Sequence, residues 1–291
     1  MRSRDLKEKL VHYILTGMAA SSLLALAGIV IFLFMEGLPL FAHYSPIDFL
    51  FGDLWYPTED PGLFGIFPLL VASLAVTFFS SLLAVPLGVL TAVYLTEIAH
   101  PGVRRIIKPF VELLAALPSV VLGFLGMVVL APFLQDYLNA ATGLNLLNAS
   151  LVLAFMSVPT ICSVSEDALY SVPRDLREAS LALGATRWEV VRTTVLPFGM
   201  SGYVSGAMLG LGRALGETIA LLIILRGTQK AFGWSLFDGG YTFASKIAAA
   251  ASEFNDQYKA GAYIAAGLVL FILTFVVNSL ARAAVSGKGR S

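Results

Sequence analysis

Six long stretches of mostly apolar residues run along the chain, separated by shorter polar connections. A helix needs about 20 apolar residues to cross a lipid bilayer. We therefore predict six transmembrane helices, over residues 13–35, 67–96, 109–134, 147–165, 197–225 and 261–284. Three of these stretches contain a proline that predicts a kink or a break, namely Pro86, Pro118 and Pro159.

The connections alternate in positive charge. Fourteen Lys and Arg residues lie before the first stretch, after the second, after the fourth and after the sixth, whereas the alternate connections hold four. Because Lys and Arg are enriched in cytoplasmic connections, both termini are expected in the cytoplasm. The prediction is a cytoplasmic N-terminus 1–12, one transmembrane domain 13–284 and a cytoplasmic tail 285–291, in an all-α membrane protein.

Composition supports the membrane assignment. Hydrophobic residues make up 57% of the chain and charged residues 13%, against about 25% charged residues in an average soluble protein. The net charge is zero, which argues against nucleic acid as a partner. The single cysteine, Cys162, excludes disulfides and thiolate metal sites within the chain and is expected to be a small apolar filler. The first apolar run is longer than a signal-peptide core, so we expect a retained span.

The outer connection 36–66 is long, acidic and rich in aromatic residues. Trp55, Tyr56, Phe49 and Phe51 lie within it. These residues predict either a docking surface for an external partner or an aromatic belt at the membrane surface, which Trp and Tyr commonly form.

The cytoplasmic connection 166–196 carries the most specific pattern, within SVPRDLREASLALGATRWEVVRTTVLP at 171–197. A first helix is expected from about Pro173 to Gly184, because proline suits a first turn and glycine can end a helix in the left-handed conformation. A second should begin at Thr186, which forms a capping box with Glu189, and should end at Pro197. The result is a helical hairpin suited to a groove on a cytoplasmic partner.

This hairpin resembles the EAA loop of ATP-binding-cassette (ABC) importer permeases. Glu178 and Ala179, then Gly184, then Leu196 and Pro197 have the spacing of the family pattern, while Ser180 replaces an alanine and Thr194 an isoleucine. The resemblance implies a type I importer permease in which these five matching residues couple the spans to an ATPase.

Further segments narrow the resemblance to the PstC-type permeases of phosphate importers. They are GDLWYPTEDPGLFGIFPLLVASLAVT, LAALPSVVLGFLG, SVSEDALYSVP and GLGRALGET, and the similarity extends from about residue 45 to 225. The resemblance implies a second, PstA-like permease, two copies of a PstB-like ATPase, an external PstS-like phosphate-binding protein and a place in the cell inner membrane. The binding protein would deliver phosphate at the outer loops 36–66 and 226–260.

The fifth stretch contains a charged pair, Arg213 and Glu217, with no other charge between Pro197 and Leu225. A charge near the bilayer centre costs about 2.5–3.5 kcal/mol on insertion scales and is a functional candidate by default. Four positions apart on one helix, the two side chains would share a face and partly neutralise each other. A guanidinium binds phosphate oxygens in bidentate fashion, and a competing carboxylate keeps binding weak enough for release. We predict that both line the substrate pathway; a structural salt bridge is the alternative.

Glycines of the same stretch predict close helix packing in lipid. Gly202, Gly206 and Gly210 are spaced by four, and Gly212 and Gly216 form a second ladder. We therefore expect the fifth span to be buried between neighbours and to line the pathway at the contact with the second permease.

No GxxxxGK[ST] motif occurs in the sequence, so we expect no enzyme activity and no cofactor of its own, with ATP bound by the partner ATPase. GLGRALG lies in an apolar helix without a preceding strand and is not a dinucleotide fingerprint. Histidines occur only at span ends or outside, which argues against an intramembrane protease. A permease for sulfate, molybdate or phosphonate, or a self-sufficient secondary transporter, is the alternative.

Four more polar residues lie at span ends. Glu166 and Asp167 at the end of the fourth stretch are expected to be solvated interface charges, and Glu97 and His100 after the second are expected to be solvated turn residues.

Overall fold

The structure, a computed structural model, describes residues 2–57, 62–225, 235–250 and 257–286. Within these ranges the regular elements are helices and one two-stranded ribbon. Five helices are long and apolar enough to cross a membrane, and a bent pair, Arg187–Phe198 with Met200–Gly216, can form a sixth span. The predicted all-α membrane architecture is therefore confirmed. Much of the outer loop 226–260 and most of the tail 285–291 lie outside the described residues.

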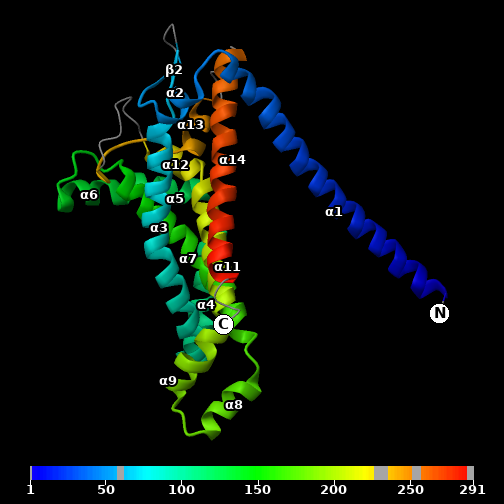
Figure 1. Cartoon of the computed structure of the whole chain (residues 1–291). Coiled ribbons are helices and arrows are strands. Elements are labelled where there is room, and N and C mark those ends of the chain that lie inside the picture. The colour runs from blue at the N-terminus through cyan, green and yellow to red at the C-terminus, as the bar shows by residue number, and fades with distance from the viewer. Residues whose placement is uncertain (1, 58–61, 226–234, 251–256, 287–291) are drawn as a thin grey trace.

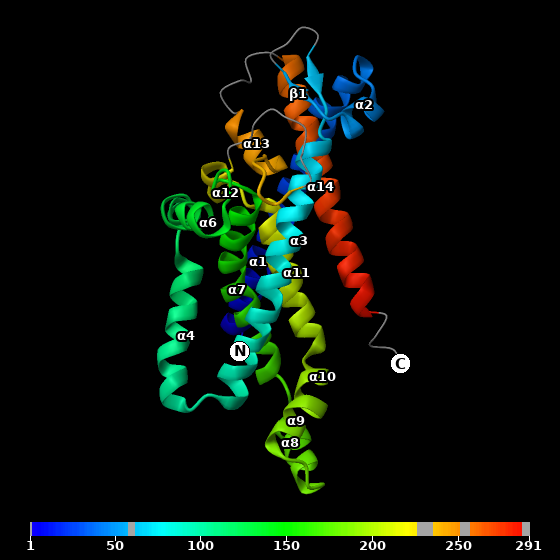
Figure 2. The same ribbon diagram turned by 90° about the vertical axis from the view of Figure 1, so that its left-hand side faces the viewer.

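The body of the molecule consists of four long helices, visible side by side in Figures 1 and 2. They are α3 (Phe67–Val93), α7 (Leu146–Tyr170), α11 (Met200–Gly216) and α14 (Gln257–Ser286). α7 packs along both α3 and α11, and α11 also contacts α14. Pro86 and Pro159 lie inside α3 and α7 without ending them. Cys162 is fully buried and free, as the apolar-filler interpretation requires.

Helix α1 (Arg2–Gly37) leaves this body at an angle (Figure 1). It contacts α14 and η1 near its C-terminal end, and the large apolar side chains from Leu10 to Leu24 remain exposed within the chain. One whole span is therefore left without a protein neighbour over most of its described length.

A small folded cap covers one end of the bundle. Its elements are η1 (Leu38–Ala42), α2 (Pro46–Phe51), β1 (Trp55–Tyr56), β2 (Leu63–Phe64) and α13 (Phe243–Ala249). Trp55 and Phe49 are 8% and 0% exposed, and the Trp55 Nε1–H donates to the Tyr263 hydroxyl of α14 at 3.4 Å. Both interpretations of these two aromatics, docking surface and membrane belt, are therefore wrong, because burying large rings stabilises the cap core. Phe51 is exposed.

The third predicted span, 109–134, contains the break that Pro118 predicts, and its bounds are wrong. The structure has α4 (Pro101–Ala116), then α5 (Ser119–Leu125), a π-helical turn η3 (Gly126–Leu130) and α6 (Ala131–Leu138). The break falls at Leu117, which is extended (φ −63°, ψ 131°) because a residue before proline, here Pro118, is pushed out of the helical region. The apolar stretch able to span is Ser119–Leu138.

The fifth predicted span, 197–225, is also interrupted. Helix α9 (Arg187–Val190) continues through a π-helical turn η4 (Val191–Val195) into α10 (Leu196–Phe198). This helix ends at Phe198, one residue after Pro197 and within the usual uncertainty of a helix boundary, as predicted. The chain then bends by 63° before α11.

The second interruption follows α11. α11 ends at Gly216, Glu217 is extended, and a short helix α12 (Ile219–Ile224) follows. The prediction of one helix through both Arg213 and Glu217 is therefore wrong.

The two ends of the molecule differ in character. The start of α1, the end of α14 and the hairpin of α8 (Arg174–Ala182) and α9 all lie toward one end, and the cap lies at the other (Figure 1). This is the arrangement that the positive-charge pattern predicts for a chain with both termini on the hairpin side.

Candidate functional site

Arg213 lies in the last turn of α11, and its side chain is partly exposed. Among the described residues it forms no hydrogen bond and no ion pair within 4.0 Å. A guanidinium has five donor N–H groups and is charged at every physiological pH. Within this part of the chain, Arg213 is therefore a charged donor group whose partners have to come from elsewhere.

Glu217 does not neutralise Arg213. The break after Gly216 takes the carboxylate off the face of α11, and its Oε1 accepts a hydrogen bond from the Ala220 N–H at 3.3 Å. Ala220 lies in the first turn of α12, whose N–H groups have no partner within the helix, so the Glu217 carboxylate caps this turn from the residue before the N-cap, Thr218. The expected i, i+4 pairing is thus absent among the described residues, because the helix that would create it ends first.

The glycines of α11 divide into two sets. A Cβ at Gly202 would collide with Ala168, one at Gly206 would lie 3.2 Å from the Ile161 carbonyl oxygen, and one at Gly210 would lie 2.8 Å from Ile161 Cδ1, so this ladder lies against α7. Gly212 and Gly216 face the other way. A Cβ at Gly212 would lie 3.9 Å from Asn278 Nδ2 of α14, and one at Gly216 would meet no atom within 4 Å. α11 is therefore packed against α7 through the first ladder and has room on the side of Gly212 and Gly216. With 3.6 residues per turn, Arg213 lies about 20° from Gly202 and from Gly206 around the helix, so it follows the packed ladder beyond its last glycine.

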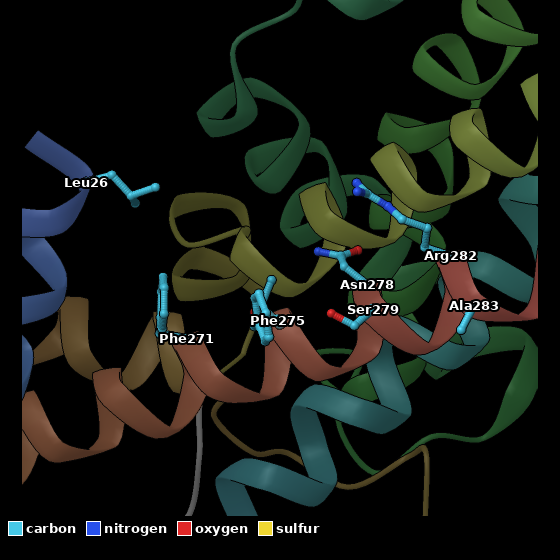
Figure 3. A pocket seen from close by; sticks show the side chains of 8 residues that line it. Leu26, Phe271, Phe275, Asn278, Ser279, Arg282 and Ala283 are labelled. Carbon is cyan, nitrogen blue, oxygen red and sulfur yellow. The ribbon is translucent and has the colours of Figure 1, made fainter. Parts of the chain in front are cut away.

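Near the side of α11 that carries Gly212, a pocket of about 650 Å³ separates α1 from α14. Figure 3 shows Leu26 of α1 across from the α14 side chains, with Asn278 and Arg282 pointing to the same side of α14. The pocket is lined by Leu26, Phe271, Thr274, Phe275, Asn278, Ser279, Arg282 and Ala283. Its wall is apolar toward the middle of α14 and polar near the hairpin end.

The α8–α9 hairpin, residues 173–198, has the predicted local structure. Pro173 precedes α8, and Gly184 has φ +89°, a conformation that favours glycine. Thr186 and Glu189 form the capping box: Thr186 Oγ1 accepts from the Glu189 N–H at 3.3 Å, and the Thr186 N–H donates to Glu189 Oε2 at 2.7 Å. Gly184 thus allows the turn, and the Thr186–Glu189 capping box starts the helix that follows it.

The hairpin presents a projecting surface. Glu178, Ala179 and Gly184 are exposed, whereas Leu196 packs against the buried cluster at the hairpin's base. Leucine and tryptophan side chains are also exposed here, Leu183 by 91% and Trp188 by 56%. Exposed apolar side chains grouped on a projection are typical of a protein contact surface.

The two departures from the family pattern contact each other. The hydroxyl oxygens of Ser180 in α8 and Thr194 in η4 are 2.8 Å apart, and the Ser180 hydroxyl also bonds the Leu176 carbonyl at 3.0 Å. An alanine and an isoleucine could make only an apolar contact at these positions. The hydrogen bond therefore replaces that contact and joins the two arms of the hairpin.

Two ion-pair sites join the hairpin end of the bundle, and sequence reasoning missed both. Arg177 Nη1 lies 2.6 Å from Glu97 Oε2. Glu166 Oε1 lies 3.1 Å from Arg104 Nη2 and 3.0 Å from Lys108 Nζ, with the Glu166 side chain 6% exposed. The solvated interpretation of Glu97 and Glu166 is therefore wrong.

The physical reason is that partners distant in the chain approach in the fold. The charges at the span ends were visible, but Glu97 and Arg177 are 80 residues apart in the chain, and one sequence carries no signal that pairs them. Asp167 and His100 are exposed as expected, and His100 Nδ1 accepts from the Gly102 N–H at 3.3 Å as the cap of α4.

Comparisons with known proteins identify the family to which this fold and site belong. Residues 84–288 match the family described as binding-protein-dependent transport system inner membrane component. Phosphate transport system permease protein PstC 2 of Mycobacterium tuberculosis is 42% identical, over 99% of this chain and 94% of the relative. PstC of Mycobacterium leprae is 45% identical, over 89% and 86%. The probable ABC transporter permease protein YqgH of Bacillus subtilis is 36% identical, over 97% and 92%.

Solved structures share the fold. A bacterial alginate ABC transporter in complex with its alginate-bound periplasmic protein contains a chain that matches with a TM-score of 0.68 at 16% identity, over 94% of this chain and 93% of that one. A chain of the inward-facing MetNI methionine ABC transporter matches with a TM-score of 0.57 at 22% identity, over 77% and 94%.

Proposed function

The chain belongs to the family of binding-protein-dependent transport system inner membrane components, and we propose that it is the PstC-type subunit that conducts phosphate across the membrane. It is a membrane permease of an ABC importer, and ATP hydrolysis belongs to a separate subunit of such systems. The observation that carries phosphate as the substrate is the identity of 42% to a phosphate permease along 99% of the chain.

The end of α11 that carries Arg213 is proposed to line the pathway. Arg213 has no described partner, lies in a span, and borders a helix break at Glu217. Non-helical backbone at membrane depth is tolerated where it is covered by protein or lines a water-filled cavity. A passing phosphate would receive charge-assisted hydrogen bonds from the guanidinium, and contact with water would keep this binding weak enough for release.

Glu217 acts in this proposal as the residue that maintains the break. By capping α12 it stabilises the end of α11 next to Arg213, and its negative charge remains near the pathway, where it disfavours prolonged retention of an anion. This role replaces that of a direct counter-ion.

The α8–α9 hairpin is proposed to dock on the ATPase. Its exposed apolar tip supports this role, as does its direct continuation through α10 into α11. A displacement of the hairpin would therefore reach the helix that carries Arg213. Glu178, Ala179, Gly184, Leu196 and Pro197 are the residues assigned to coupling.

The remaining partners follow from the complex that such permeases form. The chain works with an ATPase and a binding protein. We propose further that a PstA-like permease covers the exposed face of α1 and the pocket beside α14, that two PstB-like ATPase copies lie below, and that a PstS-like protein delivers phosphate at the cap. The pocket between α1 and α14 is the feature that supports the second permease.

Reconstitution tests the function directly. Proteoliposomes containing this chain with the second permease and the ATPase, and with binding protein outside, should import labelled phosphate when ATP is supplied inside. Unlabelled phosphate should compete and sulfate should not. Import by this chain alone, without ATPase, or equal competition by sulfate would contradict the proposal.

A further inference from the structure

Arg177 holds the α8 arm of the hairpin to the bundle, while the α9–η4 arm packs there through a buried cluster. Its Nη1 contacts both carboxylate oxygens of Glu97, at 2.8 and 2.6 Å, and its Nη2 donates to the Leu169 carbonyl at 2.9 Å. Glu97 belongs to the π-helical turn η2 (Tyr94–Ile98) that ends α3, and Leu169 lies in the last turn of α7. One planar guanidinium therefore joins α8 to two spans at once.

The contact differs from an ordinary surface ion pair. Exposed pairs contribute little because water screens them, but the Glu97 side chain is 10% exposed and the Arg177 side chain 25%. The Leu169 carbonyl, at the end of α7, accepts a long bond from the Val172 N–H at 3.4 Å and the shorter one from Arg177. A cation at that end is favoured by the helix dipole as well. Arg177 thus pairs the Glu97 carboxylate, which has no other hydrogen bond or ion pair among the described residues, and gives the Leu169 carbonyl the shorter of its two bonds.

The turn that carries Glu97 is itself unusual. A π-helical turn holds more residues than an α-helical one, and such turns are frequent at functional positions. In η2, Leu95 is 1% exposed and packs in the buried cluster at the base of the hairpin. Glu97 is therefore presented to the hairpin by a packed, irregular helix end.

The opposite arm of the hairpin is joined to α11. The Ser180–Thr194 hydrogen bond links α8 to η4, and η4 leads through α10 and the 63° bend into α11. α8 is consequently attached on one side to α3 and α7 and on the other to the stem of the helix that carries Arg213. Its displacement changes the position of α11 relative to α3 and α7 unless both attachments move together.

We propose that the Arg177–Glu97 ion pair is the contact that makes the ends of α3 and α7 follow the hairpin, so that ATPase movement becomes pathway opening. The inference rests on the proposed function of the hairpin. Arg177 and Glu97 are positioning residues in it, because neither touches the transported ion.

The test uses the complete complex in proteoliposomes and measures phosphate imported per ATP hydrolysed. The variants are Glu97→Gln, Arg177→Gln and the charge exchange Glu97→Arg with Arg177→Glu. Arg105→Gln is the matched control, because Arg105 is an exposed cation at the same end of the bundle with no ion pair among the described residues. Co-purification of the ATPase is measured for each variant.

Each single variant should assemble into the complex and hydrolyse ATP, but should lower the import-to-hydrolysis ratio about fivefold or more. Fivefold is the lower end of the effects that coupling between two sites typically has. The charge exchange should restore most of the ratio, and the control should keep the wild-type value. Wild-type ratios in the single variants would overturn the proposal. So would loss of assembly that the exchange does not restore, because the pair would then serve folding alone. If the wild-type complex imports no phosphate, the proposed function itself fails.

Discussion

Gly184→Val perturbs the turn of the α8–α9 hairpin without touching anything else. Gly184 has φ +89°, and a Cβ placed there would meet no heavy atom within 4 Å. The cost of valine is therefore a backbone cost and not a clash. Left-handed conformations cost L-residues roughly 1–2 kcal/mol, and a β-branched residue is at the unfavourable end of that range.

This cost converts into a population change. Since 1.4 kcal/mol is a factor of ten, valine should lower the equilibrium population of the native turn about 5- to 30-fold relative to alternatives. A hairpin with a rearranged turn no longer presents Leu183 and Trp188 together, so ATP hydrolysis should be separated from transport. Gly184→Asn is the matched control, because asparagine visits left-handed conformations routinely.

The assay is phosphate import and ATP hydrolysis in the reconstituted complex. The valine variant should import less phosphate per ATP than the wild type, and the asparagine variant should lie close to the wild type. The reasoning would be refuted if the valine and asparagine variants had equal, wild-type ratios, because the conformation of this turn would then be irrelevant to coupling.

Three further predictions concern packing and pairing, each measured by thermal unfolding of the purified protein in detergent. Ser180→Ala and Thr194→Ile should each lower the free energy of unfolding by about 1 kcal/mol. The double variant should lower it by much less than the sum of the two, because both hydrogen-bonding groups are then gone; additive losses would contradict this. Glu166→Gln should lower the free energy of unfolding by up to about 3 kcal/mol, because it leaves Arg104 and Lys108 without a carboxylate. Asp167→Asn, at the exposed neighbouring position, should have little effect. Equal effects of the two variants would refute the pairing of Glu166. Gly202→Ala should lower the midpoint by several degrees through a clash with α7 (roughly 1–3 kcal/mol), and an unchanged midpoint would show that α11 is not packed there.

The hairpin could be predicted closely because its signals are local. Pro173, Gly184 and the Thr186–Glu189 capping box act within a few residues of themselves, so sequence spacing is enough to locate both helices. Span existence was predictable for a similar reason: about 20 apolar residues in a row serve one physical requirement.

Breaks within spans were predicted less well. Pro118 acts on its neighbour and was recognised, whereas the break at Glu217 has no proline and depends on a carboxylate that caps the next helix. The residues on both sides of that break are mostly apolar. A span made of one continuous helix and a span made of two helices therefore have similar sequences. The assumed Arg213–Glu217 pairing failed for this reason.

Contacts between segments that are distant in the chain could not be predicted from a single sequence. Glu97 and Glu166 look like ordinary solvated charges at span ends until the fold brings Arg177, Arg104 and Lys108 to them. Trp55 and Phe49 likewise resemble surface aromatics, but Tyr263 of α14 packs on Trp55 and Phe41 of the cap packs on Phe49.

The central claim is that the guanidinium of Arg213, which has no ion pair among the described residues, assists phosphate across the membrane. Its most direct test is the initial rate of ATP-driven phosphate import by complexes that contain Arg213, Arg213→Lys or Arg213→Gln at equal amounts of assembled protein. Loss of a hydrogen bond to a charged group costs about 1.5–3 kcal/mol, so the glutamine variant should import about 10- to 150-fold more slowly, with lysine between it and the wild type. Import by the glutamine variant at the wild-type rate would contradict the account.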